Sequence, residues 1–213
     1  MDDQVQRLAN KAWTKFQTLD ASQRLLIAIA GIPGSGKTTL AALVQLAEMP
    51  NAEEAIFRRG AAFTFDSNGF FELVRQVRAP LQATTATIYA PSFDHAIKDP
   101  VPNDIGIPAT ARIVVFEGLY IALDREGWRD AAKLMDELWF VEVPFPVASE
   151  RVAKRNYAAG ISSSLEESIA RTEANDMRNG REVVAERLPV HELVQSVDDV
   201  KWRSEPAKTG ELK

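Results

Sequence analysis

Apolar runs and amphipathic stretches alternate along this chain. Mainly apolar runs predict four strands, at 25–30, 111–117, 138–143 and 193–197. Between and before these runs, stretches that suit a helix predict helices at 4–18, 70–78, 127–136, 146–158 and 164–177, the first of them from apolar residues at helical spacing. A continuous apolar run is typical of a strand buried on both faces, and strands that alternate with helices pair in parallel. The pattern therefore predicts an α/β fold with a mainly parallel sheet covered by helices on both faces.

The composition narrows the classes of protein to consider. The chain has 213 residues, 46% of them hydrophobic, which suits a single domain at 1–205 followed by a short tail at 206–213. Cysteine is absent, which excludes disulfides and thiolate metal sites, and no apolar run approaches the roughly 20 residues that span a membrane. The net charge is −5, and the first residues lack the apolar core of a signal peptide. We therefore expect a cytoplasmic protein with neither a nucleic-acid nor a membrane partner.

The stretch GIPGSGKTT carries the strongest chemical signal in the chain. It follows the first predicted strand, precedes a predicted helix, and fits the phosphate-binding pattern G-x-x-x-x-G-K-[ST]. Its glycines allow a tight turn whose backbone N–H groups face a phosphate, its lysine reaches the β- and γ-phosphates, and its threonine hydroxyl can hold Mg²⁺. The predicted ATP-binding residues are Gly31, Pro33, Gly34, Ser35, Gly36, Lys37, Thr38 and Thr39. The alternative is a glycine turn without a ligand, which leaves Lys37 and Thr38 unexplained.

Glu117 is the candidate for a second metal-organising group beside Thr38. It follows four apolar strand residues, Ile113 to Phe116, and a charge in that position is costly unless it has a partner or a task. A nucleotide site of this kind needs an acid at the end of a neighbouring strand to organise Mg²⁺. A solvent-exposed glutamate at a strand end is the alternative.

Two mixed segments, 58–66 and 89–99, are predicted to be loops that bind a second substrate. Both combine aromatic, basic and acidic side chains, which suits recognition of a polar small molecule. Asp66 and Asp94 are the candidates for accepting a proton. A structural hydrogen-bonding role for His95, and a helix-end role for the arginines at 58 and 59, remain open. The candidates for binding the acceptor are Arg59, Phe65, Tyr89, Phe93, His95 and Lys98.

A cationic helix is predicted to form part of a lid at about 148–180. Arg151, Lys154 and Arg155 are spaced so that a helix places them on one face. Such a face can neutralise charge that develops during phosphoryl transfer, so Arg151 and Arg155 join Lys37 as catalytic candidates. A solvated basic stripe near Glu150 is the alternative.

These segments together resemble the uridine kinase/phosphoribulokinase/bacterial pantothenate kinase-like family of P-loop kinases, in particular its branch of small nucleoside/nucleotide kinase-like proteins. The matching pieces cover most of residues 25–200 in the family's order: GIPGSGKTT, RRGAAFTFD, YAPSFDHAIKDP, IVVFEGLYIAL, WFVEVP, ERVAKRN and ANDMRNG. The resemblance implies a P-loop NTPase fold, three layers of α/β/α with a helical lid. It also implies transfer of the ATP γ-phosphate, with Mg²⁺, to a hydroxyl of a nucleoside-, vitamin- or sugar-like metabolite.

The resemblance also assigns roles along this chain. It implies that Gly31–Thr39 binds the nucleotide phosphates and that Glu117 is the Walker B-type acid. It places Arg151 and Arg155 in the lid, and it lines the acceptor pocket with the segments Arg59–Asp66 and Tyr89–His95.

One expected part of the family pattern is missing. Members have a second strand soon after the phosphate-loop helix, and an aspartate at its end is the expected catalytic base. Here the predicted helix leads into Met49-Pro50-Asn51 with no such strand, although a helix leaving a parallel strand should lead into another strand. We expect that about 25–40 residues are missing between about 43 and 52. Without them, Asp66 or Asp94 has to supply the base.

The sequence predicts a metabolite kinase and leaves two alternatives. A regulatory ATPase would use hydrolysis to move a partner-binding loop, and an inactive binding module would keep only the phosphate loop. The mixed segments favour a kinase, because a switch needs no second small-molecule pocket. The identity of the acceptor and the oligomeric state, a homodimer included, stay open.

Overall fold

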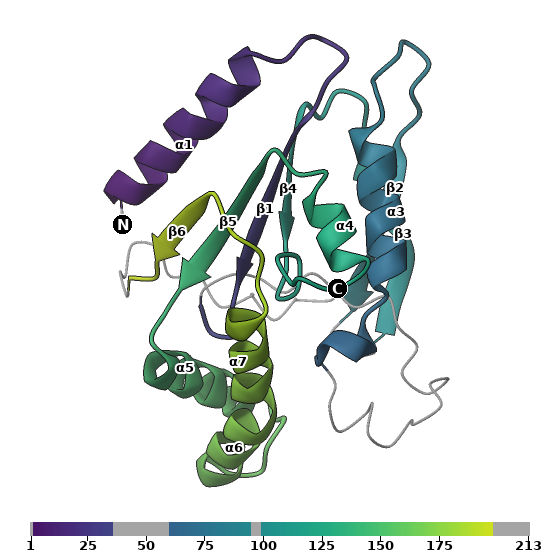
Figure 1. The fold of residues 1–213 in the computed structure, drawn as a ribbon. Coiled ribbons are helices and arrows are strands. Elements are labelled where there is room, and N and C mark those ends of the chain that lie inside the picture. The colour runs from purple at the N-terminus through teal and green to yellow at the C-terminus, as the bar shows by residue number, and fades with distance from the viewer. Residues whose placement is uncertain (1, 36–59, 95–98, 198–213) are drawn as a thin grey trace, which may run out of the picture.

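The computed structural model describes residues 2–35, 60–94 and 99–197. Its centre is a four-stranded parallel sheet in the order β4-β1-β5-β6 (Figure 1). The strands are β1 (Leu25–Gly31), β4 (Ile113–Glu117), β5 (Glu137–Glu142) and β6 (Glu192–Gln195). All four strands were predicted from apolar runs, with boundaries that differ by up to two residues. The predicted α/β fold with a mainly parallel sheet is confirmed.

The parallel register brings the carboxyl ends of the strands together at one edge. Ile29 of β1 pairs with Glu117 of β4, and Gly31 pairs with Val141 of β5. Val141 in turn pairs with Val194 of β6. Ligands of open parallel sheets bind beyond these carboxyl ends, so this edge is where a site is expected.

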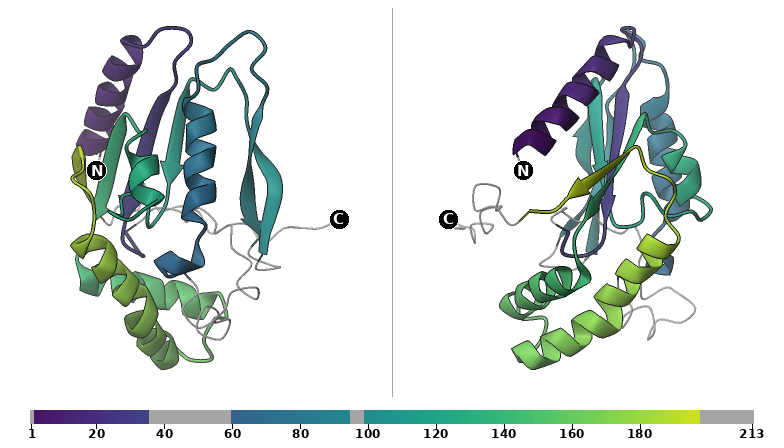
Figure 2. Two further views of the ribbon diagram at one scale, coloured as in Figure 1. Left: turned by 45° about the vertical axis from the view of Figure 1, so that its right-hand side comes forward. Right: turned by 60° about the vertical axis from the view of Figure 1, so that its left-hand side comes forward.

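Alternate residues of β1 enter two different cores. Leu26, Ala28 and Ala30 belong to the larger core, which α3 (Ser67–Arg78) and α4 (Trp128–Ala132) cover and to which Val183 of α7 (Arg178–Ala185) contributes. Leu25 and Ile27 face α1 (Asp2–Gln17) instead. The two faces of the sheet are thus covered by different helices, as the views in Figure 2 show.

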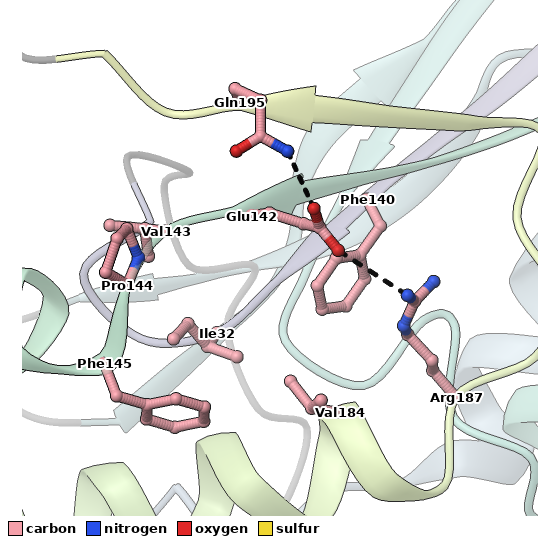
Figure 3. Close-up of a pocket in the computed structure, with 9 residues that line it drawn as sticks. All are labelled: Ile32, Phe140, Glu142, Val143, Pro144, Phe145, Val184, Arg187 and Gln195. Carbon is pink, nitrogen blue, oxygen red and sulfur yellow. Dashed lines mark hydrogen bonds and ion pairs between the residues drawn. The ribbon is translucent and has the colours of Figure 1, made fainter.

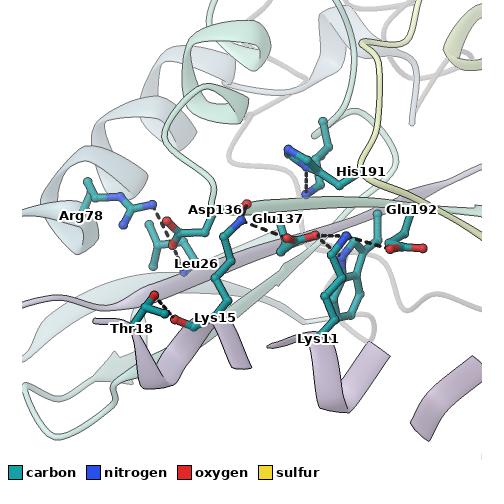
Figure 4. Close-up of polar contacts among 11 residues, drawn as sticks. Lys11, Lys15, Thr18, Leu26, Arg78, Asp136, Glu137, His191 and Glu192 are labelled. Atoms are coloured by element: carbon teal, nitrogen blue, oxygen red, sulfur yellow. Dashed lines mark hydrogen bonds and ion pairs between the residues drawn. The ribbon is translucent and has the colours of Figure 1, made fainter. Parts of the chain in front are cut away.

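Buried charge fastens α1 to the sheet. The side chain of Glu137 is 3% exposed and pairs with Lys15 at 2.9 Å and with Lys11 at 3.1 Å (Figure 4). Glu192 accepts from Lys11 at 2.7 Å and from Arg7 at 2.5 Å. These ion pairs add to the apolar contacts of Leu8, Ala12 and Phe16 and fix the position of α1 on the sheet.

Residues 89–94 and Asp99 lie in strands, which corrects the prediction that the segment 89–99 is a loop; residues 95–98 lie outside the described residues. β2 (Ile88–Asp94) and β3 (Asp99–Ile107) form an antiparallel hairpin beside α3. Prolines at 91, 100 and 102 hide the strand pattern, because proline cannot donate to a ladder and is tolerated only at edges and bulges. The register shift between Ala90 and Ser92 places Pro91 at such an irregularity. Ile107 packs into the larger core, and Ala90 is buried.

Three helical segments group beyond the carboxyl ends of the strands (Figure 1). α5 (Phe145–Ala158) and α6 (Leu165–Arg171) lie where helices were predicted, and a π-helical segment (Thr172–Met177) links α6 to α7. Of the other predicted helices, 4–18 and 70–78 correspond to α1 and α3, whereas α4 is shorter than 127–136. Within the described ranges, no helix is long and apolar enough to cross a membrane.

Candidate functional site

The described start of the phosphate loop turns directly out of β1. Gly31 ends the strand, and the N–H of Ser35 donates to the carbonyl of Ile32 at 3.1 Å, which closes a turn. Gly34 has a φ of +76°, a conformation that favours glycine. A Cβ at Gly34 would lie 2.6 Å from the carbonyl oxygen of Ala148 in α5. The loop therefore rests on α5, and only glycine fits at its contact point.

Ser35 has a buried hydroxyl beside this turn. The residue is 2% exposed, and its Oγ makes no hydrogen bond within the part of the chain that the structure describes. A buried hydroxyl without a partner is costly, and a bound group that accepts its hydrogen bond removes that cost. The start of the loop thus fits the phosphate of a nucleotide.

Glu117 lies on the strand next to the loop, at the end of β4. It pairs in register with Ile29, two residues before Gly31, and its Oε1 is buried. Strand pairing therefore places a half-buried carboxylate beside the phosphate loop, as the sequence predicted. Among the residues that the structure describes, no three His, Asp or Glu side chains cluster as a metal site.

The segment before α3 is anchored through an aromatic cluster. The Oη of Tyr120 donates to the carbonyl of Gly60 at 2.6 Å. Phe65, predicted to bind the acceptor, packs against Tyr120 and Trp128 with ring centroids 5.4 and 6.3 Å away. Phe63, which the sequence did not single out, is 49% exposed. The half-buried Phe65 therefore helps to hold the segment, and Phe63 is its solvent-facing ring.

Asp66 is the N-cap of α3. Its carboxylate accepts from the N–H of Gly69 at 2.8 Å, and its side chain is exposed. Capping of this kind satisfies a helix N–H that has no partner inside the helix. The structure gives Asp66 a structural task, and its role as a base stays a prediction.

Tyr89 and Asp94 occupy opposite ends of β2. They are five positions apart, which is about 17 Å along a strand. Asp94 ends β2 on the side of the molecule where β1 also ends (Figure 1). The exposed ring of Tyr89 lies over Gly106, its cross-strand partner. The hairpin therefore does not bring Tyr89 and Asp94 together.

The three predicted lid cations have three different surroundings. Arg151 donates to the carbonyl of Gly34 at 3.3 Å and to the hydroxyl of Ser196 at 2.9 Å, so it contacts the phosphate loop itself. Lys154 pairs with Glu150 in an exposed position, as the solvated alternative supposed. Arg155 is exposed and donates to the side chain of the buried Asn156 at 3.4 Å.

A pocket of about 290 Å³ lies beyond the carboxyl ends of β5 and β6 (Figure 3). Glu142 on its wall is paired with Arg187 at 3.6 Å and accepts from Gln195 at 2.7 Å. Of the nine described residues that line this pocket, Ile32 lies within the predicted phosphate loop, and the other eight are not among the predicted binding or catalytic residues. The nine are Ile32, Phe140, Glu142, Val143, Pro144, Phe145, Val184, Arg187 and Gln195.

Two curated relatives identify the family. A protein of Aspergillus versicolor named "ATP-dependent kinase-like protein notR'" is 49% identical over 150 residues, which cover 70% of this chain and 87% of that protein. A Schizosaccharomyces pombe protein named "Putative uridine kinase C227.14" is 39% identical over 189 residues, covering 76% of this chain and 79% of that protein. The chain belongs to the uridine kinase-like family of P-loop kinases. No protein-family model matches the chain.

A solved structure supports the same fold. The crystal structure of a "putative fructose transport system kinase" from Silicibacter sp. TM1040 is similar with a TM-score of 0.73 and 25% sequence identity. The similarity covers 87% of this chain and 98% of that one. The sheet and the helices around it are therefore those of a P-loop kinase.

The alignment of this uridine kinase-like chain with its fission yeast relative contains positions that this chain does not fill. The alignment spans 189 positions, yet 76% of this chain is about 162 of 213 residues. Roughly 27 aligned positions thus hold a residue of the relative and none of this chain. The shortfall agrees in size with the predicted missing segment. Its predicted place, between about 43 and 52, lies outside the described residues.

Several predicted site residues of this P-loop kinase also lie outside the described residues, and their roles stay predictions. For Phe93 and Asp94 the structure describes the strand but not the side chains. The residues wholly outside are Gly36, Lys37, Thr38, Thr39, Arg59, His95 and Lys98.

Proposed function

We propose that this protein is an ATP-dependent small-molecule kinase that transfers the γ-phosphate to a hydroxyl of a nucleoside-, vitamin- or sugar-like metabolite. The observation that carries the proposal is the phosphate loop on α5, with Gly34 fitted against Ala148 and a buried Ser35 hydroxyl that has no hydrogen-bond partner among the described residues. Kinase names among the relatives agree with ATP use.

Two groups on neighbouring elements support the donor half of the site. Glu117 at the end of β4 offers a carboxylate beside the loop, and with Thr38 it would hold Mg²⁺. Bound Mg²⁺ would neutralise charge on the β- and γ-phosphates. Arg151, already in contact with the carbonyl of Gly34, adds a positive charge at the same place. Together with Lys37 these groups would stabilise the charge of the transferring phosphoryl group.

The acceptor would lie between the anchored segment Gly60–Asp66 and the Asp94 end of the hairpin. Phe63 offers an exposed ring there, Asp66 has an exposed carboxylate, and Asp94 stays the second predicted candidate for orienting a hydroxyl. Asp66 and Asp94 both belong to segments outside the parallel sheet, so the position of these segments can differ between kinases that act on different metabolites.

A screen of ATP consumption against nucleosides, vitamins and sugars tests the proposal. Turnover that rises with one class of acceptor supports a kinase, and equal turnover without any acceptor indicates an ATPase instead. Lys37→Ala should abolish turnover, because the lysine is predicted to contact the β- and γ-phosphates. Lys154→Ala is the matched control, since Lys154 is exposed and paired with Glu150.

The second candidate function is an inactive nucleotide-binding module. The shortfall of roughly 27 aligned positions favours it, because the family's catalytic aspartate is expected in that part of the chain. ATP binding without turnover against any acceptor would decide for the module.

A further inference from the structure

The interior of the helices beyond the sheet is unusually polar. Asn156, Ser162, Ser168, Thr172, Asn175 and Asn179 are each at most 6% exposed. They come from α5, α6, α7 and the segments between them. Buried polar side chains cost stability unless they are paired, and Ser168, for example, donates to the carbonyl of Ala153 at 2.8 Å.

Asn156 connects two charged groups within this interior. Its Oδ1 accepts from the guanidinium of Arg155 at 3.4 Å, and its side chain also hydrogen-bonds to the carboxylate of Asp176. The residue itself is 5% exposed, whereas Arg155 is exposed and Asp176 is half-buried, so Asn156 joins the surface to the interior. A buried amide that uses both of its ends can hold the two charges in one arrangement.

Asp176 lies in the π-helical segment Thr172–Met177. Two arginines act on its half-buried carboxylate, Arg155 from α5 and Arg171 from α6. Burial raises the pKa of Asp176, and the two arginines oppose that rise. π-helical turns are rare and often occur at functional sites.

We propose that Asp176 and Asn156 are positioning residues that hold Arg155 toward the transferring phosphoryl group. This inference rests on the proposed kinase function. Arg155 is exposed and would otherwise sample many rotamers, which reduces the benefit of its charge to a transition state. Asn156, which hydrogen-bonds to both side chains, and the negative charge of Asp176 together restrict the Arg155 side chain. Arg151 needs no such device, because it is already held by Gly34 and Ser196.

The first test needs no turnover. The titration of the Asp176 carboxyl carbon is followed by NMR in the full chain and in Arg155→Met. Because the positive charge of Arg155 lowers the pKa of Asp176, removal of that charge should raise the pKa. Lys154→Met, one residue along the same helix, should leave the titration unchanged, since Lys154 pairs with Glu150. An unmoved titration in Arg155→Met overturns the inference.

The second test uses turnover. Asp176→Asn keeps the shape and removes the charge, and it should lower kcat about tenfold with ATP affinity within about twofold. It should also remove the acid limb that protonation of Asp176 adds to the pH profile. Glu173→Gln, in the same π-helical segment but paired with Arg181 and Ser149, should behave as the wild type. An Asp176→Asn variant with wild-type kcat and pH profile overturns the inference. Failure of the kinase proposal is distinguishable, because the wild type itself would then show no acceptor-dependent turnover.

Discussion

Gly34 is the residue where the geometry of the phosphate loop is most demanding. Its positive φ alone makes another residue costly, and the carbonyl of Ala148 occupies the space of a Cβ. Because Ala148 belongs to α5, a side chain at Gly34 would push the loop away from the helix that carries Arg151. The loop and the predicted lid are therefore coupled at one backbone contact.

Gly34→Ala should destabilise the protein and weaken ATP binding together. We expect a loss of at least about 2 kcal/mol from left-handed strain and the clash with Ala148. Gly160→Ala is the control, because Gly160 has a φ of +68° but no atom within 4 Å of its Cβ position. It should cost about 1 kcal/mol and leave ATP affinity unchanged. Thermal unfolding and ATP titration measure both, and a Gly34→Ala variant that binds ATP normally would contradict the assignment of the loop.

Substitutions at Asp66 can distinguish a role in capping α3 from a role as the catalytic base. Asp66→Ala should cost about 1 kcal/mol, because the N–H of Gly69 loses its acceptor. Asp66→Asn keeps an acceptor in the same place and should restore stability. If Asp66 is only a cap, Asp66→Asn also keeps turnover with an identified acceptor. Wild-type stability with lost turnover would instead make Asp66 the base.

The residues that could be predicted from sequence are those whose role depends on near neighbours in the chain. The loop from Gly31 to Ser35 follows from a buried strand and a glycine pattern, both local. Phe65 could not be assigned, because its burial depends on Tyr120 and Trp128, more than fifty residues later. Phe63 and Phe65 look alike in the sequence, and only the tertiary contacts decide which ring faces solvent.

At the scale of elements, the strands of the parallel sheet could be predicted from local sequence, whereas those of the hairpin could not. β1 and β5 are nearly continuous apolar runs, since both of their faces are buried. β2 and β3 carry prolines and an irregular register, so their strand character depends on pairing that no short window shows. The described residues of the segment 89–99 were therefore mistaken for a loop, while the four parallel strands were predicted within two residues.

The attachment of α1 should depend on pH through Glu137. Burial opposes ionisation of this group, but hydrogen bonds from Trp139, Lys15 and Lys11 outweigh it, so the pKa of Glu137 lies below 4.5. A carboxyl with a lowered pKa in the folded state stabilises the fold above its unfolded pKa, and that contribution is lost as pH falls through the folded pKa. Thermal unfolding should therefore show a loss of stability below about pH 4.5.

Glu137→Gln should remove most of this acid dependence. At neutral pH it should cost about 2 kcal/mol, because hydrogen bonds to a buried charge are lost. Glu72→Gln is a suitable control, since Glu72 pairs with Arg75 on the surface with 50% of its side chain exposed. That change should cost less than about 0.5 kcal/mol. Equal effects of the two substitutions would mean that α1 is not held by Glu137.

At the scale of the whole molecule, the two edges of the sheet are finished differently. The outer edge of β6 is capped, because the side chain of Gln4 accepts from the N–H of Gln195 and donates to its carbonyl. Among the described residues, only β1 pairs with β4. Val115 of β4 is 53% exposed, although its register partner Ile27 is 3% exposed. An unprotected edge with exposed apolar residues is unusual, and an added strand is the simplest cover for it.

If β4 is an uncovered edge strand, substitutions on its exposed face should have little effect on the free energy of unfolding. Val115→Thr should change the free energy of unfolding of this 213-residue chain by less than about 0.5 kcal/mol, because Val115 is half in water. Ile27→Thr, on the same face of the neighbouring strand, should cost about 2 kcal/mol, since a hydroxyl is then buried in the core. Denaturant unfolding of the two variants measures the difference. Equal costs would mean that part of the protein outside the described residues covers β4. The roughly 27 positions present in the fission yeast relative would then not be needed to explain that edge.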